Sequence, residues 1–184
     1  LRTGDGGITW REISPDLTRN EVAKQDDGGG PFTNEGAGGE IYNTISYLAA
    51  STHQAGVMWA GSDCGLVHLT RDEGKNWTNV TPPNLREVLI NAIESSPHNP
   101  SAAYVVATRY KFDDFTPMVY YTNDWGKTWT KITNGFDKND FVRVVREDRK
   151  QPGLLYAGTE RGLFVSFDNG KNWQKFQSNL PAVP

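Results

Sequence analysis

One eight-residue pattern, Ser/Thr-x-Asp-x-Gly-x-x-Trp, occurs four times in this chain of 184 residues. Each tryptophan is followed three positions later by an apolar residue, and the aspartates are 67, 52 and 44 residues apart. Self-similarity at such intervals is the signature of folds assembled from one repeated supersecondary unit. The paired aspartates and tryptophans of the four copies are Asp5 and Trp10, Asp72 and Trp77, Asp124 and Trp129, and Asp168 and Trp173.

The sequence before each of the last three copies contains the same series of extended segments. A strand-like run, a turn, an aromatic run with small residues and a third strand-like run lead into the motif, and a fourth run follows the tryptophan. Short β-rich runs at regular spacing, without long helical periodicity, favour four-stranded antiparallel sheets. We therefore predict an all-β fold, with one sheet in each of residues 44–80, 91–132 and 142–176.

The motif has a local chemistry that explains its repetition. An aspartate at a hairpin corner accepts hydrogen bonds from backbone N–H groups just downstream, and the glycine two residues later permits the positive φ of such a turn. The Ser or Thr hydroxyl bonds back across the loop, and the tryptophan covers a large area between neighbouring sheets. Four copies of one catalytic site would be unusual on so short a chain, so we interpret the motifs as structural corners.

The motif and its placement resemble the Asp-box, or BNR-repeat, β-propellers, a group that includes sialidases, xyloglucan hydrolases and sortilin-type receptors. The chain is most similar to sortilin-like bacterial propellers, and residues 13–18, 59–67, 109–115 and 156–162 carry this resemblance. It implies a partial β-propeller of four-stranded antiparallel blades, with the Asp boxes on the hairpins between third and fourth strands. It also implies that ligands bind at the opposite face, where second and third strands are joined.

The repeats amount to about three and a half blades, whereas closed propellers typically have about four to eight. An open fragment exposes strand edges and apolar blade faces. We therefore expect the chain to be part of a larger propeller, completed by further sequence or by a second copy of the chain. The expected organisation is the end of a blade in residues 1–13, an insertion loop in 14–43, blades in 44–80, 91–132 and 142–176, and a link to a next blade in 177–184.

Two irregular segments fall on the expected ligand face. The first, residues 14–43, contains two glycine-rich runs and is interpreted as an insertion. A flap over the ligand face, or a cation loop using Asp26, Asp27 and Glu40, is the alternative. Calcium takes about six or more oxygen ligands, and no spaced Asp-x-Asp pattern supplies them, so no metal or other cofactor is expected.

The second irregular segment is residues 109–117 of the middle blade, an extended loop where the other blades have only Asp-Cys or Glu-Arg. Its mixture of Arg, Tyr, Phe and Asp suits contact with a sugar or a peptide, because aromatic and Arg side chains are favoured anchors. A loop packed onto its own neighbours, with a solvated acidic tip, is the alternative. The candidate ligand-binding residues are Asp63, Arg109, Tyr110, Asp113, Asp114, Glu160 and Arg161.

Charge and composition exclude several classes of function. The formal net charge is -3, so the chain has no general electrostatic attraction for nucleic acid or an anionic membrane. No apolar run approaches the length of a membrane span, so membrane insertion is not expected. The single cysteine, Cys64, excludes an internal disulfide, and His53, His68 and His98 lack metal-ligand spacing and are interpreted as ordinary polar residues.

These observations favour a recognition or scaffold module that binds a protein or a glycan. The alternative is part of a glycoside hydrolase of the xyloglucanase or sialidase type, whose two carboxylates lie about 5–9.5 Å apart. Asp63, Asp113, Asp114 and Glu160 are available on the loop face, but the Arg-Ile/Leu-Pro element and the Tyr–Glu pair of a sialidase are not visible. The family resemblance implies an extracytoplasmic location, in a secreted or periplasmic protein.

Overall fold

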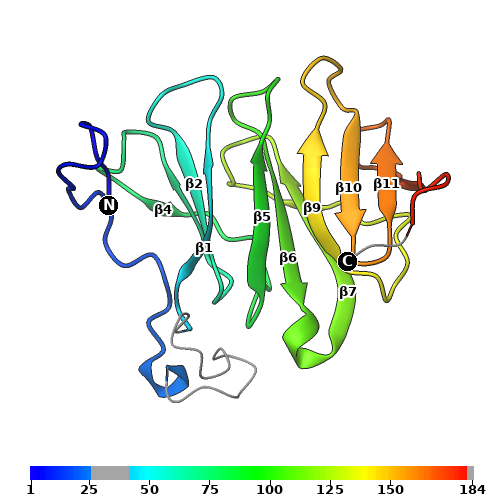
Figure 1. Ribbon diagram of the computed structural model, residues 1–184, viewed down its shortest axis with the longest axis horizontal. Coiled ribbons are helices and arrows are strands. Elements are labelled where there is room, and N and C mark those ends of the chain that lie inside the picture. Colours follow the sequence, from blue (N-terminus) through cyan, green and yellow to red (C-terminus); the bar gives the residue numbers. More distant parts are fainter. Residues whose placement is uncertain (26–41, 182–184) are drawn as a thin grey trace.

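Residues 1–25 and 42–181 are described in the computed structural model, and they contain three four-stranded antiparallel sheets that stand side by side (Figure 1). This is the partial β-propeller that the repeats predict, and each sheet is one blade. The blades are β1 (Ile45–Ala50), β2 (Met58–Ser62), β3 (Val67–Thr70) and β4 (Thr78–Asn79); β5 (Leu89–Ser95), β6 (Ala103–Arg109), β7 (Asp114–Thr122) and β8 (Thr130–Lys131); and β9 (Val142–Glu147), β10 (Leu155–Thr159), β11 (Leu163–Ser166) and β12 (Gln174–Lys175). Two short 3-10 helices are η1 (Val22–Lys24) and η2 (Tyr110–Phe112).

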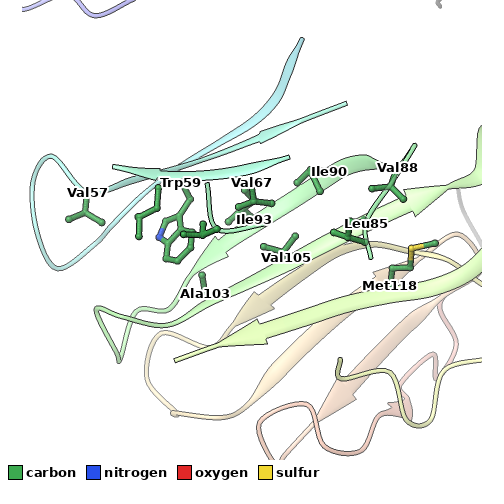
Figure 2. Close-up of a cluster of buried hydrophobic side chains, with 13 residues drawn as sticks. Val57, Trp59, Val67, Leu85, Val88, Ile90, Ile93, Ala103, Val105 and Met118 are labelled. Atoms are coloured by element: carbon green, nitrogen blue, oxygen red, sulfur yellow. The ribbon is translucent and has the colours of Figure 1, made fainter. Parts of the chain in front are cut away.

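Apolar side chains from facing blades form two cores, one between each pair of neighbouring blades. Strand β6 contributes to both, because Ala103 and Val105 pack toward the first blade while Tyr104 and Val106 pack toward the third. Successive residues of a strand point to opposite faces, so burial on both faces explains why this run is apolar without alternation. Figure 2 shows the first core, in which the Trp59 side chain is fully buried.

The first strand of each blade lies next to the first strand of the neighbouring blade, and each of these inner strands carries a β-bulge. The bulged residues are Ser46, Asn91 and Arg143. The Ser46 hydroxyl donates to the carbonyl of Ile90 at 2.8 Å, and the Asn91 amide donates to the carbonyl of Arg143. The bulges therefore aim a polar side chain of one blade at the backbone of the next.

The Asp boxes have the same hydrogen bonds in all four copies. In the third box, the N–H and hydroxyl of Thr128 donate to Asp124 at 2.9 and 2.6 Å, and the Thr122 hydroxyl donates to the same carboxylate at 2.8 Å. The Gly126 N–H donates back to the Thr122 hydroxyl at 3.0 Å. Both Gly126 and the preceding Trp125 have positive φ, so the corner needs two left-handed residues in succession. Equivalent bonds recur around Asp5, Asp72 and Asp168, with the side-chain amides of Asn76 and Asn172 in place of the Thr hydroxyl in the second and fourth boxes.

The tryptophans of the boxes connect one blade to the preceding one. The indole N–H of Trp129 donates to the carbonyl of Val80 at 2.8 Å, and that of Trp173 donates to the carbonyl of Ile132 at 2.9 Å. Each acceptor is the apolar residue three positions after the previous tryptophan, and Trp77 bonds to Ile13 in the same way. Within one repeat, the indole N–H therefore donates to the unit before it, and the carbonyl three positions later accepts from the unit after it. The constant three-residue spacing links these two interfaces.

Two histidines form a second repeated contact between blades. The His53 Nε2 lies 3.1 Å from the carbonyl oxygen of Ser96, and the His98 Nε2 lies 2.7 Å from that of Asp148. Both histidines are in the turn between the first and second strands of a blade, and both contact the residue directly after the next inner strand. Their interpretation as ordinary polar residues missed this role, because the sequence does not show which backbone carbonyl faces the turn.

We predict that the Trp129→Phe substitution lowers the free energy of unfolding by about 1–2 kcal/mol, because it removes one hydrogen bond between blades and some buried ring area. Trp10→Phe is the matched control, since within the described part of the chain the Trp10 indole bonds only to the Gly7 carbonyl of its own box, and Trp10 is exposed. Urea denaturation followed by fluorescence gives both values. Equal losses for the two variants would contradict the role of the indole bond.

We also predict that the protein loses stability as the pH falls from about 4 to about 2. Hydrogen bonds from the Thr128 hydroxyl and N–H lower the pKa of Asp124 to about 2, and the equivalent bonds from Thr9 lower that of Asp5 to about 2. A carboxyl group whose folded pKa is depressed stabilises the fold above its unfolded pKa and loses that contribution as it is protonated. Thermal melts across this range test the prediction. An unchanged melting temperature would contradict it, and Asp124→Asn should reduce the pH dependence.

Candidate functional site

The two ends of the blades carry different structures. Because neighbouring strands run antiparallel, the β2–β3 turn lies at the opposite end of a blade from the β3–β4 hairpin with its Asp box. The β2–β3 turn also meets the segment that enters the inner strand, since the Asp63 N–H donates to the Thr44 carbonyl and the Glu160 N–H to the Phe141 carbonyl, both at 3.1 Å. We call this the loop end; it is the lower end of the blades in Figure 1.

The turn of the second blade at the loop end differs from the other two. Residues 110–112 form η2, and Asp113 follows in the left-handed conformation with φ of 55°. The structure corrects the expected extent of this loop, since Arg109 ends β6, Asp114 begins β7, and the two residues pair across the strands. Pro117 lies at the register shift between β6 and β7, where a residue without an N–H is tolerated. The blade is therefore extended here by longer strands.

This extension brings the second and third blades into contact through aromatic rings. The Tyr110 ring stacks on the Phe141 ring with centroids 5.4 Å apart, and the Phe115 ring lies 6.0 Å from Phe141. The guanidinium of Arg143 lies 4.8 Å from the Phe141 centroid and 5.4 Å from that of Tyr110, and pairs with the Glu160 carboxylate at 2.7 Å. We call these five residues the aromatic–arginine cluster.

Arg143 departs from the role of its equivalents in the other blades. At the same bulged position, the side chains of Ser46 and Asn91 donate to the backbone of the next blade. The Arg143 side chain instead contacts rings of two blades and the Glu160 carboxylate. Sequence reasoning did not name Phe141 or Arg143 as site residues, and it counted Phe115 only as part of the composition of residues 109–117. Aligning the inner strands by their bulges would have shown an arginine where the other repeats have small polar residues.

A small pocket lies between the first and second blades at the loop end. Asp63, Arg109 and Tyr110 line it together with Tyr42 and Glu87. Three of the seven candidate residues therefore line one pocket. Tyr110 also belongs to the aromatic–arginine cluster, and this cluster contains a fourth candidate, Glu160. Aromatic rings combined with a few fixed charged groups are typical of small-ligand sites.

The Asp63 carboxylate holds the chain that enters the first blade. It accepts hydrogen bonds from the N–H groups of Asn43 and Thr44 at 3.0 and 2.9 Å, and from the Thr44 hydroxyl at 3.2 Å. Burial raises the pKa of this carboxyl, and the bonds from Thr44 act in the opposite direction. These contacts give Asp63 a structural role at the wall of the pocket.

The remaining candidates lie at the edges of the site. Asp114 lies 3.7 Å from Arg109; although burial acts to raise the pKa of Asp114, hydrogen bonds from Thr116 lower it. The side chains of Asp113 and Arg161 are exposed, and the Arg161 N–H donates to Asp140 at 3.1 Å. The proposed cation ligands Asp26, Asp27 and Glu40 lie outside the described residues.

Two further features concern the described part of the chain as a whole. Among residues 1–25 and 42–181, no group of three or more His, Cys, Asp or Glu side chains is arranged to hold a metal ion. In the same ranges, no helix has the length and apolar character needed to cross a membrane.

The stacked blades, the Asp-box corners and the loop-end site together define an Asp-box β-propeller. The family model for Sortilin-Vps10, described as "Sortilin, neurotensin receptor 3", matches residues 65–183, which is more than half of the chain. The chain therefore belongs to the Sortilin-Vps10 family.

Comparison with individual proteins agrees with the β-propeller fold. A probable oligoxyloglucan-reducing end-specific xyloglucanase of Neosartorya fischeri is 27% identical over 139 residues, covering 66% of this chain and 16% of that protein. An ancestral GH74 enzyme has a similar structure, with a TM-score of 0.60, 20% identity and coverage of 73% of this chain and 18% of that one. The structure of YCF48 bound to D1 peptide is also similar, with a TM-score of 0.56 and 21% identity, and the match covers 72% of this chain and 40% of that one. The chain thus spans less than half the length of these proteins.

We predict that two substitutions of Asp63 distinguish the contribution of its hydrogen-bond acceptor from that of its negative charge. Asp63→Ala leaves two backbone N–H groups without their acceptor and should cost about 1–3 kcal/mol of unfolding free energy. Asp63→Asn keeps one oxygen for both N–H groups and should cost less than about 1 kcal/mol. Urea denaturation measures both. If Asn destabilises the fold as much as Ala, the negative charge and not the acceptor holds this segment.

Proposed function

We propose that this chain is a recognition module of a propeller and binds a protein or glycan ligand at the loop end, through the aromatic–arginine cluster. The observation that carries the proposal is the position of Phe115, which is 40% exposed and whose ring lies 6.0 Å from Phe141, the ring that Arg143 also contacts. A partly exposed ring in a cluster that also holds a guanidinium and a carboxylate offers an apolar surface in the same cluster as a donor and an acceptor. Aromatic and Arg side chains are the groups that most often dominate binding energy in such surfaces.

The charges at the loop end support binding more than acid–base chemistry. Glu160 is held by Arg143 at 2.7 Å, and Asp63 is bonded to the backbone of residues 43 and 44. Carboxylates that are already held by an arginine or by backbone N–H groups are fixed in position, so they orient a ligand well. The structural neighbour YCF48 is bound to a peptide, which supports a peptide as one ligand class. The match to a sortilin receptor family supports an extracytoplasmic location, which we propose with the binding function.

A binding experiment with loop-end variants tests the proposal. We expect the chain to bind at least one member of a panel of xyloglucan oligosaccharides, sialosides and peptides, and Phe115→Ala or Arg143→Ala to weaken this binding about tenfold or more. Phe167→Ala is the matched control, because Phe167 is an exposed aromatic residue in an Asp box at the opposite end of the blade. Titration calorimetry gives the affinities. Equal losses for Phe115→Ala and Phe167→Ala would contradict the proposed site.

A glycoside hydrolase is the second candidate function, because burial raises the pKa of Asp63 beside a pocket, as a general acid requires. The similarity to a xyloglucanase supports the same class. Incubation with xyloglucan oligosaccharides and sialosides, followed by detection of reducing ends, separates the candidates. Our proposal expects no turnover. Turnover that Asp63→Asn reduces by about a hundredfold or more would establish the hydrolase instead.

A further inference from the structure

The links, which join the outer strand of one blade to the inner strand of the next, close the two blade interfaces to different extents. The second link, residues 132–141, lies on the Asp box of the third blade. The Trp173 N–H donates to the Asn134 carbonyl at 2.8 Å, and the Phe136 ring stacks on the Trp173 ring with centroids 4.9 Å apart. The Asn134 side-chain amide also donates to the Asn172 side chain at 2.6 Å. Trp173 is therefore only 4% exposed.

The equivalent space beside the first link, residues 80–88, is an open groove between the first and second blades. Thr81 and Pro83 of the link form one wall, and Lys127 and Trp129 of the second blade's box form the other. The groove has a volume of about 540 Å³, and small-ligand sites span roughly 300–1,000 Å³. This interface therefore has room for a side chain and a short stretch of backbone.

Trp129 leaves open the groups that Trp173 uses in contact with its link. No described residue accepts a hydrogen bond from the Trp129 backbone N–H, although its indole N–H is bonded to Val80. Its ring meets the Trp59 ring at an interplanar angle of 74°, and no described ring stacks on it in parallel. Trp129 is therefore partly exposed, whereas Trp173 is buried.

The sequence of the first link explains why the groove stays open. Gly135 of the second link has a φ of 103°, and a Cβ at this position would overlap the Trp173 carbonyl. Pro83 stands at the same position of the first link, and its ring fixes φ at about −65°. The first link therefore cannot approach its box as closely. The Val67 N–H also donates to the Thr81 hydroxyl at 2.9 Å, which holds the start of this link on its own blade.

We propose that this groove binds a peptide segment of a partner protein, in which Asn-Gly precedes an aromatic residue and an acidic residue follows it. The second link is the template for this occupant, because it makes the same contacts with the third blade. A backbone carbonyl of the peptide accepts a hydrogen bond from the Trp129 N–H, and its aromatic ring stacks on the Trp129 ring. The groove lies beside an Asp box, at the opposite end of the blades from the aromatic–arginine cluster, so this site does not rest on the function proposed for that cluster.

Charge supports the acidic residue in this occupant. Lys127 is the one charged side chain among the described residues that line the groove, and it is exposed. In the second link, Asp137 directly follows Phe136. A peptide that repeats this order carries a charge opposite to that of Lys127, which favours its approach and its orientation in the groove.

NMR titration of the isotope-labelled chain with a synthetic peptide tests the proposal. The probe has the sequence of residues 133–138, Thr-Asn-Gly-Phe-Asp-Lys, with blocked ends so that only its side chains are charged. We expect saturable shifts of the Trp129 amide and indole signals. A peptide with Ala in place of Phe should bind about tenfold or more weakly, because it cannot cover the Trp129 ring. No binding of the Phe peptide at millimolar concentration, or equal binding of both peptides, overturns the proposal.

Two matched lysine variants locate the site. Lys127→Glu places a carboxylate in the groove and should weaken binding of the Phe peptide about fivefold at low salt. Lys171→Glu is the control and should leave the affinity unchanged, since Lys171 holds the same box position beside the interface that the second link already fills. Both lysines are exposed, so neither substitution should impair folding. Equal affinities for the two variants, or shifts centred on the aromatic–arginine cluster, would place the peptide elsewhere and overturn the proposal.

Discussion

The hydrogen bond from the indole of one blade to a backbone carbonyl of the preceding blade is the interaction on which the stacking of this propeller depends. A sheet of four short strands cannot bury both of its faces alone, so it is stable only against neighbours. The indole bond fixes where a neighbour sits, because Trp129 and Trp173 reach carbonyls at equivalent positions of the blade before them. Once that position is fixed, the bulged inner strands and the histidine turns meet their own acceptors.

The loop-end site is a consequence of this stacking. When two blades are held in register at the box end, their turns at the opposite end are brought side by side. The second blade has longer strands there, so Tyr110 and Phe115 reach Phe141 of the third blade. Arg143 then lies over rings from both blades and pairs with Glu160. The regular part of each blade supplies rigidity, and the irregular end supplies the side chains of the proposed binding site.

Much of the fold was predictable because the repeat encodes local hydrogen bonds. Asp124 bonds to groups two to four residues away, so the eight-residue motif contains all the partners that define its role. The site was predictable only in part. Arg109 and Tyr110 were recognised from an irregular composition, but the expected loop was too long, because the pairing of Arg109 with Asp114 is a property of two strands. The contacts of His53 and His98 between blades were not predicted, because their partners are backbone carbonyls of another blade.

By itself the sequence determined the strand-rich repeat, the corners and the three blades within residues 44–176, since each depends on contacts within one repeat. Only the tertiary structure decided which side chains meet across blades. Tyr110, Phe141 and Arg143 come from two repeats, and no spacing in the sequence relates them. Their contact depends on how far one blade is rotated against the next. That rotation is fixed by the packing of whole faces and by the indole bonds, and not by any local preference of these residues.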